Sequence, residues 1–134
     1  EIIDEVQSFT KDRDIIGLEQ KLIDGKKEHL FDDVSWIKQE YAKKLEKFQY
    51  YTAAQKTHSI VLAAVLEKFW NNISPLIRKN IDEETILKNI SEKVIEPVYQ
   101  LIENEGCEDI MGLTRSDING MIYYLTGKCH IKWN

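Results

Sequence analysis

TRSDINGMIYYLTGKCHIKW, residues 114–133, carries the clearest structural signal in this chain. Thr114 is followed three residues later by Asp117, which is the acidic form of a capping box at a helix start. Leu113 and Ile118 have the spacing of a hydrophobic staple across the same cap. We therefore predict that a helix begins at this point and is closed firmly at its first turn.

The predicted helix has an apolar stripe at i, i+3, i+4 and i+7 and stops at Gly127, where a glycine accepts the left-handed C′ conformation. The stripe consists of Ile118, Met121, Ile122 and Leu125. Cys129–Trp133 then alternates like a short strand, and Cys129 and Ile131 should share one face of it. We expect Ile131 and Trp133 to pack onto the helical body beside Met121 and Leu125, and His130 and Lys132 to face solvent or a partner.

Composition sets limits on the class of protein. The 134 residues predict one domain, and 43% hydrophobic with 31% charged residues is typical of a globular chain. The net charge of -5 disfavours a nucleic-acid or anionic-membrane surface. The longest apolar run, Ile60–Leu66, is far shorter than the roughly 20 residues of a membrane span, so no membrane segment is predicted.

The first residue is Glu1, and a helix-like pattern is already running there. This predicts that residues 1–134 are a single helical domain from the C-terminal part of a longer protein. Only two cysteines are present, Cys107 and Cys129, and two thiols make no disulfide framework. We expect a cytoplasmic location, where thiols stay reduced.

The N-terminal part of the chain predicts short helices over residues 1–9 and 15–23, with residues 10–14 as a polar connector and Gly25 as a C′ residue. Residues 26–74 follow without glycine or proline and carry an amphipathic pattern. Its predicted core stripe is Val34, Ile37, Tyr41, Leu45 and Phe48. The pattern weakens over residues 49–59, which leaves two alternatives: a break near Thr57, or one long or gently bent helix, which we favour.

After Pro75, the sequence predicts a helix capped by Asp82, with Glu83 and Glu84 in its first turn. Pro97 lacks an N–H group and should kink this helix before it ends near Asn104. Residues 106–112 are predicted to be a loop. The expected fold is therefore all-α, a bundle of long antiparallel helices with a short C-terminal β-like segment.

Catalytic and metal-binding patterns are weak. His29, His58 and His130 have no helpful local partner, and Cys129 and His130 should point to opposite faces of an extended segment. No metal or cofactor is therefore expected. Helical ribonucleases of the HEPN type need a histidine six residues after an arginine, and none of the arginines in this chain has one at that distance. A helical nuclease or hydrolase using His58 or His130 remains the alternative from the enzyme class.

Aromatic residues offer a second alternative. Phe48, Tyr50 and Tyr51 lie among lysines and could stack nucleic-acid bases, although the same residues more often form the edge of a core. Trp36, Trp70 and Trp133 are better explained as anchors of a core or an interface.

Two stretches resemble a known family. They are WIKQEYAKKLEKFQYYTAAQKTH, residues 36–58, and the ending from Asp117 to Trp133 that includes Gly120, Gly127 and Cys129. They are similar to the C-terminal domains of ABC-three-component proteins of bacterial conflict systems, from about Val34 to Trp133. In that family an ABC-type ATPase, a middle component and an effector act together. The resemblance implies an effector upstream of this domain, and a C-terminal domain that couples it to the other components.

We therefore expect a non-catalytic adaptor that binds a protein partner, either the ATPase or the middle component. A homo-oligomerisation domain, such as a homodimer, is a further alternative. The expected partner-binding residues lie at the end of the last helix and in the terminal segment: Tyr123, Tyr124, His130, Ile131, Lys132 and Trp133.

Overall fold

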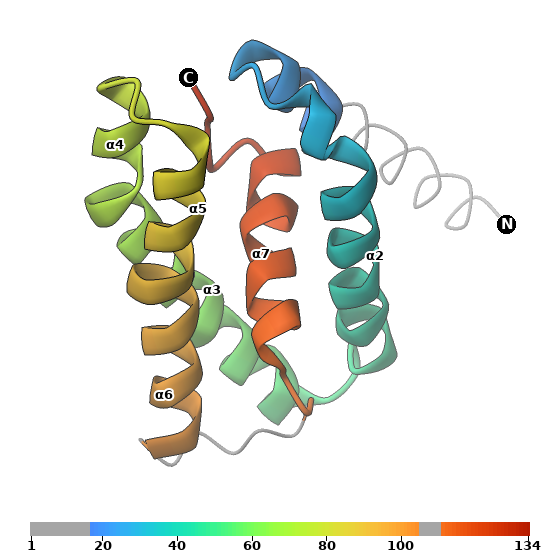
Figure 1. The fold of residues 1–134 in the computed structure, drawn as a ribbon. Helices are drawn as coiled ribbons and strands as arrows, with labels where there is room; N and C mark the ends of the chain where they lie inside the picture. Colours follow the sequence, from blue (N-terminus) through green and yellow to red (C-terminus); the bar gives the residue numbers. More distant parts are fainter. Residues whose placement is uncertain (1–16, 105–110) are drawn as a thin grey trace, which may run out of the picture.

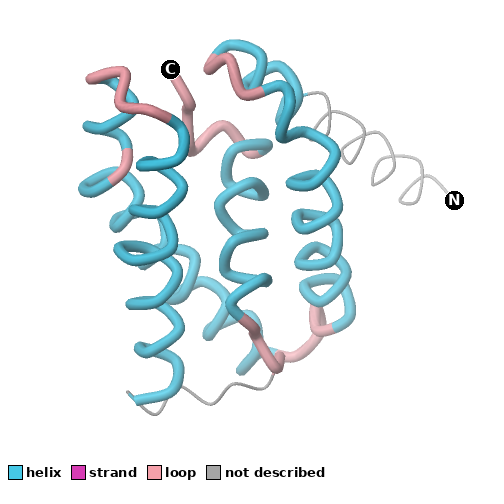
Figure 2. The backbone as a smooth tube through the Cα atoms, viewed as in Figure 1, coloured by secondary structure: helices cyan, strands magenta, loops and turns pink. Residues whose placement is uncertain are grey.

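The computed structural model describes residues 17–104 and 111–134, and these residues are organised as helices joined by short turns (Figures 1 and 2). Residues 17–24 are helical. They are followed by η1 (Glu28–Leu30), α2 (Phe31–Lys47), α3 (Thr52–Asn72), α4 (Ser74–Arg78), α5 (Glu83–Ile90), the π-helical turn η2 (Ser91–Ile95), α6 (Glu96–Asn104) and α7 (Arg115–Gly127). The all-α class is confirmed. The predicted helices over residues 1–9 and the connector over 10–14 lie outside the described residues.

Helix α7 is the central element of the domain. It lies between α2 on one side and the α5–α6 helix on the other, and α3 also packs against it (Figure 1). The buried side chains of α7 include those of the predicted stripe, so this prediction is confirmed: Ile118, Met121, Ile122 and Leu125. Around them the core is completed from the other helices, for example by Leu18, Leu22, Val61, Val65, Phe69, Val94 and Val98.

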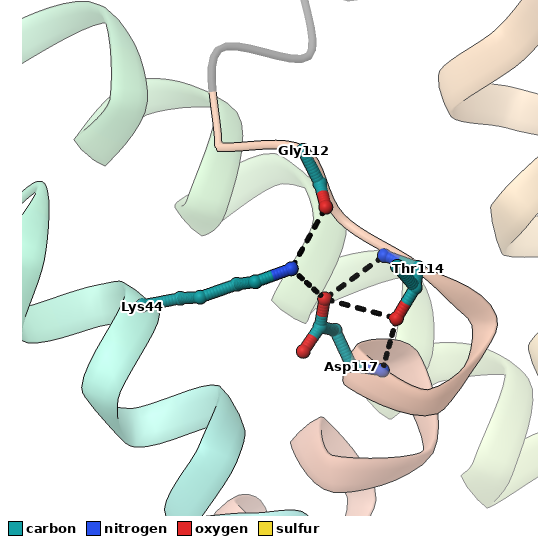
Figure 3. A network of polar contacts seen from close by, with 4 residues as sticks. All are labelled: Lys44, Gly112, Thr114 and Asp117. Atoms are coloured by element: carbon teal, nitrogen blue, oxygen red, sulfur yellow. Dashed lines mark hydrogen bonds and ion pairs between the residues drawn. The ribbon is translucent and has the colours of Figure 1, made fainter.

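The start of α7 is fixed by the predicted capping box and by a lysine from α2 (Figure 3). Thr114 Oγ1 accepts a hydrogen bond from the backbone N–H of Asp117 at 3.1 Å, and Asp117 Oδ2 accepts one from the backbone N–H of Thr114 at 2.9 Å. Lys44 Nζ donates to the same carboxylate at 2.5 Å and to the carbonyl oxygen of Gly112 at 2.8 Å. Gly112 and the start of α7 are therefore tied to the last turn of α2.

The single long helix favoured for residues 26–74 is wrong, and so is the alternative break at Thr57. Helix α2 ends at Lys47 and α3 begins at Thr52, with Tyr51 in an extended conformation between them. The turn is held by its own hydrogen bonds, because the carbonyl oxygen of Phe48 accepts from the backbone N–H of Tyr51 at 3.1 Å and from Gln55 Nε2 at 3.2 Å. No glycine or proline marks this turn, which explains why the sequence pattern missed it.

The break also changes the predicted core stripe of α2. Val34 and Tyr41 are buried, whereas Ile37, Leu45 and Phe48 are only partly buried. The side of α2 near its end borders a groove rather than another long helix. The antiparallel arrangement of long helices and the β-like terminal segment are not confirmed, and residues 131–134 have no regular secondary structure.

Two glycines predicted to be C′ residues have other roles. The left-handed residues after these helices are Lys26 (φ 58°) and Cys129 (φ 70°), one or two positions beyond Gly25 and Gly127. Gly25 is instead a point of close approach, since a Cβ there would clash with the backbone carbonyl group of Trp133. Gly127 is buried inside the last turn of α7. Both predictions assigned the left-handed conformation to the glycine at the end of the helix. In the structure Lys26 and Cys129 adopt it instead.

Asp82 caps α5 as predicted, with its carboxylate accepting from the backbone N–H of Thr85 at 3.0 Å. A π-helical turn, η2, ends at Ile95, two residues before Pro97. Pro97 lies in the first turn of α6, where its missing N–H group is tolerated. The kink predicted at Pro97 stays a prediction. The helix continues beyond Pro97 to Asn104.

Among the described residues, the stretch Thr52–Arg78 has the length and composition of a possible membrane span, with a mean hydropathy of 1.2. Core helices of folded domains pass the same test. One face of this stretch supplies buried core residues, namely Val61, Val65, Phe69 and Ile73.

Candidate interaction site at the C-terminal segment

The end of α7 turns the chain back onto the helical body. Cys129 adopts a left-handed conformation, and the backbone N–H of His130 donates to the carbonyl oxygen of Leu125 at 2.9 Å. The N–H of Cys129 donates to the carbonyl oxygen of Thr126 at 3.1 Å. Together these bonds form a Schellman motif, which sends the next residues across the end of the helix rather than away from it.

Trp133 fixes the terminal segment in the core. Its ring stacks on Tyr123 with centroids 5.7 Å apart, and it meets Phe69 of α3 edge-on at 5.3 Å. Its Nε1 donates to Thr126 Oγ1 at 3.1 Å, so the buried indole has its polar atom satisfied. Ile131 is 0% and Trp133 is 2% exposed, and the predicted packing of both residues onto the helical body is confirmed.

The remaining residues of the segment are on the surface. His130 and Lys132 are exposed, as predicted. Cys129 is also exposed, so the prediction that it shares a face with the buried Ile131 is wrong. Its left-handed backbone breaks the alternation that an extended segment would have kept.

A groove of 220 Å³ lies between this segment and the end of α3 with α4. Its walls include Trp70, Arg78, His130 and Lys132. Trp70 Nε1 donates to the carbonyl oxygen of His130 at 3.1 Å, which ties one wall to the other. The Trp70 ring is nevertheless 50% exposed. The sequence suggested Trp70 as an anchor, but it gave no signal that Arg78 would reach the same place.

The six residues predicted to bind a partner differ in how far they are buried. Tyr123, Ile131 and Trp133 hold the segment in place, and burial raises the pKa of the Tyr123 hydroxyl. Tyr124 is partly buried and borders a different groove of 550 Å³ between α2 and α3. His130 and Lys132 are the members that a partner can reach at the terminal segment.

His58 is a packing residue. It is 8% exposed, and its Nδ1 is hydrogen-bonded to the hydroxyl of Tyr41 in α2. Burial lowers the pKa of His58, since a charged imidazole would lose its hydration. Burial, as the largest cause, also raises the pKa of the Tyr41 hydroxyl.

His58 and His130 do not share a site. Trp70, which bonds to His130, lies about 18 Å further along α3 than His58, at about 1.5 Å per residue. Among residues 17–104 and 111–134, no group of acidic, histidine and cysteine side chains is placed to hold a metal ion. Cys107 lies outside the described residues.

The aromatic cluster at the α2–α3 turn is surface-exposed. Tyr50 is 89% and Tyr51 is 59% exposed, while Phe48 packs edge-on against Tyr51 with centroids 5.7 Å apart. Trp36, on the outer side of α2, is 62% exposed. Tyr50, Tyr51 and Trp36 therefore belong to the surface of the domain, whereas Phe48 is partly buried and packs against the edge of the core.

The two stretches that resemble the family meet in space. Tyr41 contacts both His58 and Tyr124, Lys44 bonds to Asp117, and Gly120 lies against the backbone of Ile37. These contacts join α2, α3 and α7. The residues of both stretches therefore contribute to the packed framework of the domain.

Comparison with known protein families identifies the family of this domain. The sequence model for C-terminal domain 9 (CTD9) of the ABC-three component (ABC-3C) systems matches residues 17–133. The match extends further towards the N-terminus than the resemblance noted from the sequence. No curated protein and no solved structure matches the chain. Since the match covers most of the chain, the protein belongs to the family of C-terminal domain 9 of the ABC-three-component systems.

Proposed function

We propose that this domain is a non-catalytic interaction module that couples the protein carrying it to another component of its ABC-three-component system. Membership of a family of multi-component systems supports a protein partner. The observation that carries the proposal is the terminal segment. Ile131 and Trp133 are buried as anchors, and the alternate residues His130 and Lys132 line a groove beside the half-exposed Trp70.

Such an arrangement is suited to binding a protein. Interfaces commonly rely on a few tryptophan, tyrosine and arginine side chains surrounded by contacts that exclude water. Trp70 and Arg78 are residues of this kind, and the segment beside them is already ordered. A surface ordered before binding loses little conformational entropy when the partner arrives.

The proposed partner is the ATPase or the middle component of the same system, and the proposed location is the cytoplasm, where an ATP-driven conflict system acts. Trp36 offers a second exposed anchor on α2, 62% exposed and bordered by Lys43 and Lys47.

Co-purification tests the proposal. The full-length protein that contains this domain would be expressed with the ATPase and the middle component, and compared with a version lacking residues 17–133. We expect the intact protein to retain at least one component and the shortened protein to lose it. Retention of both components by the shortened protein would contradict the proposal.

Two controls separate the alternatives. Light scattering on the purified chain reports self-association, and a stable dimer with no component bound would favour a homo-oligomerisation domain. A nuclease assay with His58→Ala and His130→Ala variants addresses catalysis. Activity that disappears with either histidine would contradict the non-catalytic proposal.

A further inference from the structure

The ionisable side chains that line the terminal groove all carry positive charge when ionised. They are Arg78 from α4 and His130 and Lys132 from the terminal segment, and the other lining residues are Trp70, Ser74, Ile77 and Asn134. The whole chain has a net charge of -5. The groove is therefore locally basic on a chain that is acidic as a whole, and this local charge favours a negatively charged ligand.

The basic groups of the groove are not neutralised by their surroundings. Arg78 and Lys132 form no ion pair within residues 17–104 and 111–134, in contrast to Lys44 with Asp117 and Arg115 with Glu96. Arg78 also borders an adjoining groove, whose acidic residues are Asp24, Asp82 and Glu83. Asp24 accepts a hydrogen bond from Gln20 at 2.8 Å. Asp82 is engaged in capping Thr85, and Glu83 is bonded to His29 at 2.6 Å.

Trp70 supplies an apolar contact in the same groove. Its N–H is already donated to the carbonyl oxygen of His130, so the exposed half of the ring offers surface rather than a hydrogen-bond donor. Ile77 adds a second apolar side chain to the lining. A ligand that fits this groove therefore combines an apolar side chain with negative charge near it.

The size of the groove bears on the ligand as well. At 220 Å³ it is smaller than the roughly 300–1,000 Å³ of pockets that enclose drug-sized molecules. This favours one anchoring side chain of a larger partner. A single-stranded nucleic acid is disfavoured, because such ligands follow an extended positive groove. Here three basic groups line one small groove on an acidic chain.

We propose that this groove docks an acidic peptide segment of a protein partner, with an aliphatic or aromatic residue of that segment against Trp70 and its carboxylates against Arg78 and Lys132. This inference rests on the proposed function and gives the partner's chemistry. The charges of Arg78 and Lys132 would help to orient the segment and accelerate its association.

The test uses a short synthetic peptide, a central leucine flanked by glutamate and aspartate, added to the isotope-labelled chain and followed by NMR. A matched peptide replaces the acidic residues with lysine. We expect the acidic peptide to shift the indole N–H signal of Trp70 and the amide signals of residues 130–134. The affinity should fall as salt rises, because salt screens exposed charges. The lysine peptide should leave these signals unchanged.

Charge reversal sharpens the test. The double variant Arg78→Glu/Lys132→Glu should weaken peptide binding by at least about tenfold, equivalent to about 1.4 kcal/mol. The control Lys88→Glu/Lys93→Glu makes the same change in net charge at exposed positions of α5 and η2, and it should bind like the wild type. Melting curves verify that both variants are folded.

Several outcomes would overturn the inference. They are an acidic peptide that shifts no groove signal, equal binding of the lysine peptide, equal loss in both double variants, or tighter groove binding by a thymidine oligonucleotide. Co-purification of a system component despite a failed peptide experiment would leave the proposed function standing. Peptide binding without any retained component would instead support the groove and contradict the proposed function.

Discussion

Gly120 of α7 lies directly against Ile37 of α2. A Cβ at Gly120 would come within 2.7 Å of the carbonyl oxygen of Ile37 and 3.0 Å of the Cβ of Tyr41. The first of these atoms is backbone and cannot rotate away. The most extensive helix pair in the domain, α2 with α7, therefore depends on the absence of a side chain at this position.

Gly120→Ala should lower the free energy of unfolding by about 1–3 kcal/mol, the usual cost of overpacking a well-filled interior. The gain in helix propensity, up to about 1 kcal/mol, is too small to offset the displacement of α2. Thermal melting measures this loss of stability. Ser116→Ala is the control, since Ser116 is exposed on the same helix. A Gly120→Ala variant as stable as the control would show that α2 can move at no cost.

Features encoded locally were predictable from the sequence. The Thr114–Asp117 box and the Asp82 cap depend on residues three positions apart, and the buried stripe of α7 depends on helical periodicity. The break over residues 48–51 was not predictable, because it is held by backbone carbonyls and by Gln55, with no residue typical of a turn.

The candidate site was predictable only in part. Burial of Ile131 and Trp133 followed from their apolar character at a chain end, and exposure of His130 and Lys132 followed from alternation. Arg78 is separated from these residues by about fifty positions, and its place in the groove depends on how α4 leaves α3. Long-range placement of this kind has no local signature.

Lys44 should contribute more to stability than its neighbour Lys43. Lys44 bonds to the carboxylate of Asp117, whose side chain is 7% exposed, and to the carbonyl oxygen of Gly112. Lys44→Met should cost about 1–3 kcal/mol, because it removes hydrogen bonds to a charged, nearly buried group.

Lys43→Met is the matched control for this change. Lys43 pairs with Glu40 while its own side chain is 72% exposed. Exposed pairs of this type contribute about 0–1 kcal/mol. Denaturant unfolding gives the free energy of unfolding of both variants. An equal decrease in the two variants would mean that Lys44 is only a solvated surface charge.

His58 should make the domain less stable in mild acid. Its pKa in the folded chain is lowered by burial, whereas an unfolded histidine titrates near pH 6.5. Below about pH 6.5 the unfolded chain therefore binds a proton that the folded chain resists, so the free energy of unfolding falls as pH falls. Above that pH, His58 is neutral in both states and adds no pH dependence.

Melting temperatures between pH 5 and pH 8 measure this effect. His58→Gln should flatten the decline below about pH 6.5, since glutamine does not titrate in this range. His130→Gln, at an exposed position of the terminal segment, should leave the decline in place. Identical pH profiles for wild type and His58→Gln would indicate that His58 is protonated as easily in the folded chain as in the unfolded one.

Trp133 should be the most costly residue of the terminal segment to remove. It stacks on Tyr123, contacts Phe69 and donates to Thr126 Oγ1. Trp133→Ala should lower the free energy of unfolding by about 3–5 kcal/mol, the range for a buried aromatic residue. The exposed neighbour Lys132→Ala should change it by less than about 0.5 kcal/mol.

Truncation after Lys128 extends the same prediction from stability to binding. It removes Trp133 together with His130, whose carbonyl oxygen accepts the hydrogen bond from Trp70. We therefore expect the truncated chain to melt at a lower temperature and to bind no component of its system. Thermal melting and co-purification measure the two effects separately. Since Lys132→Ala leaves the anchors in place, it should weaken binding without lowering the melting temperature. If truncation changed neither property, the terminal segment would be a passive tail, and its buried tryptophan would contribute nothing to the domain.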